Sequence, residues 1–192
     1  MSKNIILFGA TGSIGSSVLK ILDKTNGKFC LKGITCNQNI DRLIEISNQY
    51  NCHDLGISNR DISNDKNEIL TKKNTIYGIE NFESFINDDI DIYILAISGL
   101  SGASLALKIA ETGKTLAIAN KECIISLGKI LSNKCSKFGT NIFPLDSEHN
   151  AIHQLLDKDH KSIKNITITA SGGPFLNLDL NKFGHITPDQ AI

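Results

Sequence analysis

Short apolar runs alternate with amphipathic stretches along the first 143 residues of the chain. Apolar runs of about four to eight residues are typical of buried strands, whereas apolar residues recurring every three or four positions are typical of helices. We therefore predict strands at residues 5–8, 29–35, 54–57, 91–97, 114–119 and 141–144. Helices are predicted at residues 13–22, 40–50, 100–111 and 122–138, with a polar surface helix and loops at 58–73. This alternation predicts a Rossmann-like α/β fold with a doubly wound parallel sheet.

The pattern changes after residue 143, and we place a domain boundary there. Residues 1–143 are expected to form a nucleotide-binding domain, and residues 144–192 the beginning of an α+β catalytic domain. The elements predicted in this second part are a helix at 148–156, a strand at 163–170 and a loop at 171–174. Thr187 before Pro188 is typical of a helix start. Because the chain ends four residues after Pro188, we interpret the second domain as truncated.

Composition and charge narrow the class of protein. The chain has 192 residues, of which 41% are hydrophobic, so a packed core can form. Lys and Arg together number 20, as do Asp and Glu, and the net charge of zero gives no electrostatic case for binding nucleic acid or an anionic membrane. No segment approaches the ~18 consecutive apolar residues of a membrane helix, so we expect a cytoplasmic protein.

The chain has five cysteines, an odd number, and no Cys-x-x-Cys motif. This pattern favours reduced and mostly buried thiols in a reducing compartment. The alternative is a catalytic thiolate at Cys123 or Cys135.

The first candidate site is the glycine-rich turn Gly9-Ala10-Thr11-Gly12-Ser13-Ile14-Gly15. It joins the first predicted strand to the first predicted helix, where glycines let the backbone approach a dinucleotide pyrophosphate and free helix N–H groups hold the anion. The alternative is a plain tight turn. After the second strand, no acid occurs before Asp41, which favours NADP over NAD because an acid there would repel the 2′-phosphate. No Arg or Lys occurs in the turn itself, although Arg42 follows it closely in the sequence.

Three further segments follow predicted strands. In Ala119-Asn120-Lys121-Glu122, Lys121 could hold a substrate oxygen, while Glu122 also suits a helix N-terminus. Asp146 and Glu148 offer oxygen ligands of the kind that Mg²⁺ or Mn²⁺ prefers, and the ion could polarise a substrate carbonyl. Helix capping is the alternative for both acids. Residues 169–175, Thr-Ala-Ser-Gly-Gly-Pro-Phe, form either a phosphate-binding nest or a simple turn.

Taken together and in order, these segments resemble the 1-deoxy-D-xylulose 5-phosphate reductoisomerase family. The matching stretches are Gly-Ala-Thr-Gly-Ser-Ile-Gly, Ala-Asn-Lys-Glu, Pro-Leu-Asp-Ser-Glu-His-Asn-Ala-Ile and Thr-Ala-Ser-Gly-Gly-Pro-Phe. The last two are specific, whereas many families share the glycine motif. The resemblance implies an enzyme of the non-mevalonate isoprenoid pathway. It would rearrange 1-deoxy-D-xylulose 5-phosphate and reduce the resulting aldehyde with NADPH to 2-C-methyl-D-erythritol 4-phosphate.

The resemblance also implies roles for individual residues. The expected NADPH contacts are Thr11, Gly12, Ser13, Ile14, Asn37, Gln38, Asn39, Asn120 and Glu122. The expected substrate contacts are Lys121, Ser147, Glu148 and Ser171, of which Lys121 and Glu148 are also the expected catalytic residues. Asp146 and Glu148 would ligate Mg²⁺ or Mn²⁺, with Co²⁺ as a further candidate. The parent protein is expected to be a homodimer that acts on a small sugar phosphate.

The chain departs from the family in two respects. At the turn after the second strand, the family often has Gly, then a basic or small residue, then Asn. This chain has Asn37-Gln38-Asn39 instead, which leaves open the source of 2′-phosphate recognition. The family also continues with an active-site loop, a third metal carboxylate and a helical domain, so the 192-residue chain alone is expected to be inactive. One alternative is an NADP-dependent oxidoreductase of the semialdehyde dehydrogenase kind, which needs a catalytic cysteine. The other is a non-catalytic nucleotide-binding remnant.

Overall fold

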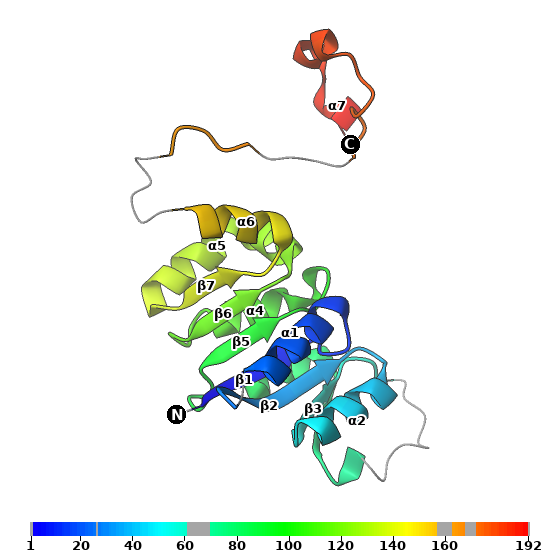
Figure 1. Ribbon diagram of the computed structural model, residues 1–192, viewed down its shortest axis with the longest axis vertical. Coiled ribbons are helices and arrows are strands. Elements are labelled where there is room, and N and C mark those ends of the chain that lie inside the picture. Colours follow the sequence, from blue (N-terminus) through cyan, green and yellow to red (C-terminus); the bar gives the residue numbers. More distant parts are fainter. Residues whose placement is uncertain (1, 26, 61–69, 157–162, 168–171, 192) are drawn as a thin grey trace. The chain divides into compact units, whose positions relative to one another are not determined.

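The computed structural model describes residues 2–25, 27–60, 70–156, 163–167 and 172–191. Residues 1–153 form one compact unit and residues 154–192 a second. The first unit contains a seven-stranded sheet in the order β4-β3-β2-β1-β5-β6-β7, and every neighbouring pair is parallel (Figure 1). The strands are β1 Lys3–Phe8, β2 Phe29–Cys36, β3 Asp54–Ile57, β4 Asn74–Tyr77, β5 Ile92–Leu95, β6 Thr115–Ile118 and β7 Asn141–Pro144. The predicted α/β fold is confirmed.

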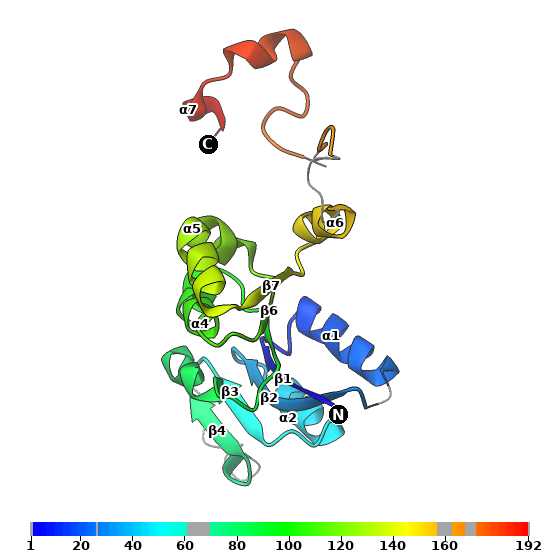
Figure 2. The ribbon, with the colours of Figure 1, turned by 90° about the vertical axis from the view of Figure 1, so that its left-hand side faces the viewer.

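Helices cover both faces of this sheet. Figure 2 shows α1 (Ser13–Lys24) and α2 (Ile40–Gln49) on one side of the strands and α4 (Ala103–Ile109) and α5 (Lys121–Phe138) on the other. A short 3-10 turn, η3 (Leu100–Gly102), leads into α4. The three layers are those expected of a doubly wound sheet.

Each face of the sheet has its own apolar core. Successive side chains of a strand point to opposite faces, so Leu7 packs with Leu19 of α1 and Leu43 of α2. Phe8, the next residue, packs instead with Leu105 of α4 on the other face. Both cores are made of buried apolar side chains, and the second also contains buried Phe and Tyr rings. The removal of these side chains from water is the main stabilising contribution to the unit.

Local signals account for several helix ends. The Asn39 side chain caps α2 by accepting a hydrogen bond from the Arg42 N–H at 3.2 Å. Gly139 ends α5 in the left-handed conformation with φ of +74°, which glycine adopts without steric cost. Inside α5, Gly128 leaves helical geometry with φ of +43°, so this helix has a break that the sequence pattern did not predict.

Two elements between residues 74 and 90 were not predicted. They are β4 and the 3-10 helix η2 (Ile79–Phe85). The Phe82 and Phe85 rings of η2 are buried and lie 6.4 and 6.2 Å, centroid to centroid, from the Phe8 ring. This segment therefore forms part of the second core.

In the C-terminal part of the chain the predictions have mixed outcomes. Helix α6 (Ser147–Leu155) matches the helix predicted at 148–156, and α7 (Pro188–Ala191) begins after Thr187 as predicted. The Thr187 N–H donates to the Gln190 side chain at 3.0 Å, the backward half of a capping box. The predicted strand at 163–170 is wrong for residues 163–167, which form no strand, and its remainder lies outside the described residues.

The second compact unit also holds the 3-10 helix η5 (Leu180–His185), and none of its described residues is buried. Most of the polar segment predicted at 58–73 lies outside the described residues. Within the described part of the chain, no helix is both long and apolar enough to cross a membrane.

Strand order creates a crevice at one edge of the sheet. The chain runs outward from β1 through β2 and β3 to β4, then returns to place β5 on the other side of β1. The connections that leave β1 and β5 therefore diverge at the carboxyl ends of these strands. In open α/β sheets, ligands bind at such a switch point.

We predict that Gly15→Ala destabilises the fold. A Cβ atom at Gly15 would lie 2.5 Å from the carbonyl oxygens of Gly9 and Ala10, and backbone cannot move aside as a side chain can. We expect a loss of about 1–3 kcal/mol in the free energy of unfolding, measured by urea denaturation. Gly12→Ala is the matched control, because its Cβ would lie 3.5 Å from the Gly9 oxygen, an ordinary contact. Equal stability of both variants would contradict this prediction.

Candidate functional site

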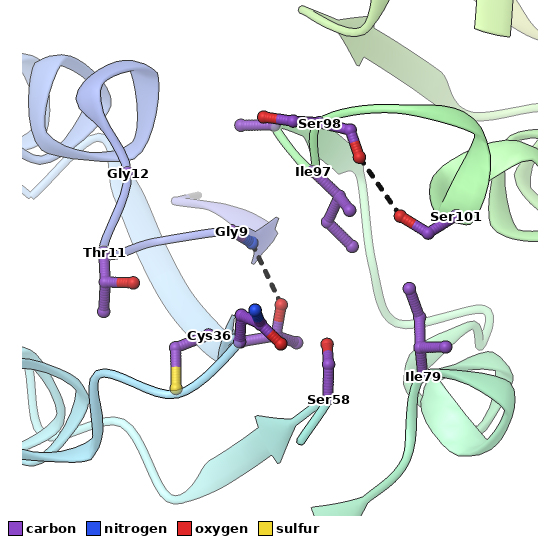
Figure 3. Close-up of a pocket in the computed structure, with 12 residues that line it drawn as sticks. Gly9, Thr11, Gly12, Cys36, Ser58, Ile79, Ile97, Ser98 and Ser101 are labelled. Atoms are coloured by element: carbon purple, nitrogen blue, oxygen red, sulfur yellow. Dashed lines mark hydrogen bonds between the residues drawn. The ribbon is translucent and has the colours of Figure 1, made fainter.

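A cavity of about 360 Å³ occupies the crevice at the carboxyl ends of β1, β2, β3 and β5 (Figure 3). The turn after β1 contributes one wall, and the segment after β5 contributes the opposite wall. Small or neutral residues form the whole lining: Gly9, Thr11, Gly12, Thr35, Cys36, Asn37, Ser58, Ile79, Ala96, Ile97, Ser98 and Ser101. Such a lining gives backbone groups close access to a ligand.

The glycines of the turn have different structural demands. Gly9 has φ of +87°, and a Cβ there would lie 2.5 Å from the Ala96 carbonyl oxygen of the neighbouring strand end, so the fold requires glycine at this position. Gly12 has φ of −81° and ψ of 179°, which any residue adopts, and its Cβ would make only an ordinary contact. The fold therefore does not require glycine at position 12, and its absence of a side chain leaves room for the close approach of a ligand.

The beginning of α1 is open to an anion. Gly12 occupies the N-cap position and offers no side chain to bond the first N–H groups of the helix. The first turn of α1 also carries no acidic residue. Unsatisfied N–H groups and the helix dipole together favour a phosphate at this position.

Thr35 holds the glycine turn in place, a role that the sequence did not reveal. Its hydroxyl accepts a hydrogen bond from the Gly9 N–H at 2.9 Å, and its carbonyl accepts one from the Ala10 N–H at 2.8 Å. The residue is buried and belongs to β2, the strand beside β1. A threonine at the carboxyl end of a strand adjacent to a glycine turn is the signal that could have pointed to this contact.

A second hollow of about 100 Å³ continues along the same strand ends from Gly12 to Asn120. Its lining includes Ser13, Ile14 and Ala119 and shares residues 96–98 with the larger cavity. Residues 96–98 were not singled out from the sequence. They lie at the carboxyl end of a predicted buried strand, which places them at this edge of the sheet.

The Asn120 amide is fully used inside the protein. Its oxygen accepts from the Cys123 N–H at 2.8 Å and caps α5, while its NH₂ group donates to the carbonyls of Ile97 at 2.5 Å and Gly99 at 2.6 Å. The side chain is buried, so these bonds tie the start of α5 to the loop after β5. This places Asn120 at the predicted site, with its amide acting as a structural clamp.

The three residues expected to contact the cofactor after β2 are separated by the structure. Asn37 lines the larger cavity, whereas Gln38 is exposed and absent from its lining. Asn39 uses its side chain to cap α2. The turn thus presents one of its three polar residues to the crevice.

Lys121 and Asp146 lie near each other, although they come from different predicted segments. The Lys121 Nζ atom is 3.9 Å from Asp146 Oδ2, and the Asp146 side chain is 12% exposed. The other carboxylate oxygen of Asp146 is 3.7 Å from Nδ1 of His149 and accepts a long bond of 3.5 Å from the His149 N–H. Asp146 thus occupies the predicted cap position and lies beside the positive charge of Lys121.

Glu148 and Ser147 lie in the exposed first turn of α6, and Glu122 lies in the exposed first turn of α5. The carboxylates of Asp146 and Glu148 are hard oxygen donors and fit a hard divalent ion, with water completing the coordination shell. Among the described residues, no group of three or more His, Cys, Asp or Glu side chains is arranged to hold a metal ion. Ser171 lies outside the described residues.

The cysteines are free thiols, and four of the five are buried. Burial raises the pKa of Cys36, which lines the larger cavity, to about 12. Burial, assisted by the Glu122 charge, also raises the pKa of Cys123, and burial alone raises that of Cys135. Because the thiolate is the nucleophile, raised pKa values disfavour the catalytic cysteine that a semialdehyde dehydrogenase needs.

Two family models match this chain. The model of 1-deoxy-D-xylulose 5-phosphate reductoisomerase matches residues 5–128, and that of the C-terminal domain of the same enzyme matches residues 142–192. A relative of that name from Ruthia magnifica is 36% identical over 191 residues, which are 98% of this chain and 50% of the relative. One from Pelagibacter ubique is 38% identical over 196 residues, 99% of this chain and 50% of the relative. The chain spans about half the length of the curated relatives it matches.

Solved structures agree with these matches. The 1-deoxy-D-xylulose 5-phosphate reductoisomerase of Zymomonas mobilis in complex with NADPH gives a TM-score of 0.84 at 31% identity, covering 100% of this chain and 52% of that one. A reductoisomerase in complex with NADPH, fosmidomycin and magnesium gives 0.75 at 28% identity, covering 99% of this chain and 50% of that one. Since the first family model alone matches more than half of the residues, the chain belongs to the 1-deoxy-D-xylulose 5-phosphate reductoisomerase family.

Proposed function

We propose that this chain binds NADPH in the crevice between β1 and β5 and supplies the first metal and substrate ligands of a reductoisomerase. The reaction is the conversion of 1-deoxy-D-xylulose 5-phosphate to 2-C-methyl-D-erythritol 4-phosphate. Gly12 carries the proposal, because it lines the cavity at the uncapped start of α1, where its backbone conformation and surroundings would permit a side chain. Family membership and the solved relative with NADPH support the same assignment.

The cofactor-binding part of the proposal uses the two adjoining hollows. Thr11, Gly12, Ser13 and Ile14 would hold the pyrophosphate, since they form the turn and the open first turn of α1. NADPH, when bound, supplies the hydride that reduces the aldehyde. The smaller hollow leads toward Asn120, whose clamp fixes the start of α5, so the reacting end of the cofactor is assigned to this side.

The preference for NADPH over NADH rests on the end of β2. No acidic residue lines the larger cavity, so nothing there would repel a 2′-phosphate or bond the free 2′-hydroxyl of NADH. Asn37 is the contact proposed on this side, with Gln38 and Asn39 as weaker assignments because their side chains do not line the cavity. Glu122 also stays a proposed contact, through its position in the first turn of α5.

The metal and substrate part of the proposal rests on Asp146, Glu148 and Lys121. A divalent ion such as Mg²⁺ or Mn²⁺, when bound, polarises the substrate carbonyl. Asp146 and Glu148 would provide two of its ligands, and the Lys121 ammonium, 3.9 Å from Asp146, would hold a substrate oxygen beside it. A solved relative contains magnesium together with NADPH and fosmidomycin. Ser147 and Ser171 complete the proposed substrate contacts.

We also propose the division into a cofactor domain, residues 1–143, and the beginning of a catalytic domain, residues 144–192. The gap between the two matched family regions, from 128 to 142, supports a boundary near this position. Assembly of the parent protein as a homodimer and the use of Co²⁺ rest on the family resemblance alone. A location in the cytoplasm rests on the sequence pattern, and all three stay predictions.

We predict that Gly12→Val abolishes NADPH binding while the chain stays folded. The isopropyl group would occupy the space proposed for the pyrophosphate, so we expect affinity to fall about 100-fold or more in a fluorescence titration with NADPH. Gly184→Val is the matched control, since a Cβ at Gly184 meets nothing within 4 Å and the residue lies outside the crevice. Unchanged binding by Gly12→Val would remove the central argument of the proposal.

We predict that Asp146→Asn and Glu148→Gln each weaken binding of Mn²⁺ and leave NADPH binding intact. Both changes keep the shape of the side chain and remove the ligand charge, so affinity should fall about tenfold or more in titrations followed by electron paramagnetic resonance. The control is Asp189→Asn, an exposed acid in the first turn of α7. Mn²⁺ affinity equal to that of the unchanged chain in both variants would return these acids to helix capping.

We predict NADPH binding without turnover by residues 1–192. Two carboxylates fix only part of an octahedral shell, so the ion would be weakly held and poorly oriented. The assay follows NADPH absorbance after addition of 1-deoxy-D-xylulose 5-phosphate and Mg²⁺. Robust oxidation of NADPH would show that residues 1–192 suffice for catalysis and that the metal site is more complete than proposed.

A further inference from the structure

The cavity proposed for NADPH has no cationic residue in its lining. All twelve lining residues are neutral, and two of them, Asn37 and Ser58, stand at the ends of β2 and β3. A 2′-phosphate carries about two negative charges and is normally bound by Arg or Lys. A neutral lining does not repel the 2′-phosphate, so it is compatible with NADPH. It offers no attraction to that phosphate, however, and so does not explain a preference of the site for NADPH over NADH.

The backbone after β3 brings one arginine to this edge. The pairing of β2 with β3 continues beyond the strands, since the Ser58 N–H donates to the Cys36 carbonyl at 2.9 Å and the Asn59 N–H donates to the Asn37 carbonyl at 3.0 Å. Arg60 is the next residue. It therefore follows directly on the segment that lies beside Asn37, where a Rossmann-like fold places the ribose of the cofactor.

The Arg60 side chain is directed toward the start of η2. Its guanidinium forms an ion pair with Glu80, and a Cβ atom at Gly78 would lie 2.8 Å from its Nε atom. Ile79, between these two residues, lines the cavity. The guanidinium thus lies over Gly78, next to a lining residue. Arginine has five N–H donors, so a pair with one carboxylate leaves donors for a phosphate.

We propose that Arg60 provides the cation that binds the 2′-phosphate of NADPH, with Glu80 orienting its guanidinium at the rim of the cavity. This inference rests on the proposed function, because it assumes that the cavity holds the cofactor. Under this proposal, Arg60 determines the preference for NADPH over NADH. It would do so at the carboxyl end of β2, where Asn37 and Gln38 carry no charge. The ribose phosphate would lie between the Arg60 side chain and the neutral ends of β2 and β3.

Arg42, the other arginine of the chain, suits this role less well. Its guanidinium bonds Glu45 at 2.9 Å on the same helix, and no residue of α2 lines the cavity. Its N–H group is bonded by the Asn39 side chain, which closes the helix start. Arg42 therefore serves as a matched control of the same residue type, charge and surface setting.

The test compares the dissociation constants of NADPH and NADH for the unchanged chain, Arg60→Ala, Arg60→Lys and Arg42→Ala, by fluorescence titration. We expect Arg60→Ala to weaken NADPH roughly tenfold to hundredfold, as loss of a charged hydrogen bond does, with NADH unchanged. Arg60→Lys should keep part of the preference, because it retains the charge without the bidentate geometry. Arg42→Ala should bind both nucleotides as the unchanged chain does. Thermal unfolding confirms that each variant is folded.

The possible failures are distinguishable. If the unchanged chain binds neither nucleotide, the proposed function is wrong, and this inference with it. If it binds NADPH and Arg60→Ala binds NADPH equally well, the inference is wrong and the proposed function stands. An equal loss of NADPH and NADH affinity in Arg60→Ala would also overturn the inference, because it would show a general effect on the crevice rather than phosphate recognition.

Discussion

The close approach of the backbone around Gly9 determines how the rest of this molecule is arranged. A Cβ at that position would lie 2.5 Å from the Ala96 carbonyl, so the ends of β1 and β5 can come together only because position 9 is glycine. A Cβ at Gly15 would likewise lie 2.5 Å from the carbonyl oxygens of Gly9 and Ala10. Glycine at position 15 therefore lets α1 pack closely against the turn that follows β1. The buried hydroxyl of Thr35 then bonds the Gly9 N–H and joins β2 to the same point. Three strand ends and one helix start are thereby fixed with respect to one another, and the crevice is the space they leave.

This constraint separates the glycines that the fold requires from Gly12, which is proposed to serve a ligand. Gly9 and Gly15 are required by close contacts within the protein, whereas Gly12 lies in an extended conformation open to any residue. Since glycine costs conformational entropy on folding, its presence at a position that lines the cavity and that no internal contact constrains favours an external contact. The uncapped start of α1 leads to the same conclusion by a different route, because its N–H groups lack partners that a phosphate would supply.

The elements that the sequence predicted are those whose signals are local. Apolar runs identified six of the seven strands, and Thr187 before Pro188 identified the start of α7. The segment from 74 to 90 was missed because its pattern is mixed, and Phe82 and Phe85 are buried only through contacts with a distant ring, that of Phe8. The reverse error occurred at 163–167, where an alternating pattern favours a strand but the described residues pair with no other strand. At the site, motifs located the glycine turn and Asn120, but the contacts of Thr35 and the position of Arg60 depend on strand pairing, which local pattern does not reveal.

The two halves of the proposed site differ in how far the protein itself completes them. On the cofactor side, the buried side chains of Thr35 and Asn120 bond neighbouring backbone, so the cavity walls are held before any ligand arrives. On the acidic side, Lys121 is 3.9 Å from Asp146, and His149 Nδ1 is buried with no hydrogen-bond partner among the described residues. The side-chain nitrogens of Lys121 and His149 both lie more than 3.5 Å from the Asp146 carboxylate, so this side is less firmly bonded than the cofactor side. Cofactor binding is therefore expected to need little rearrangement, whereas binding of a metal ion and a sugar phosphate would have to reorder the groups around Asp146.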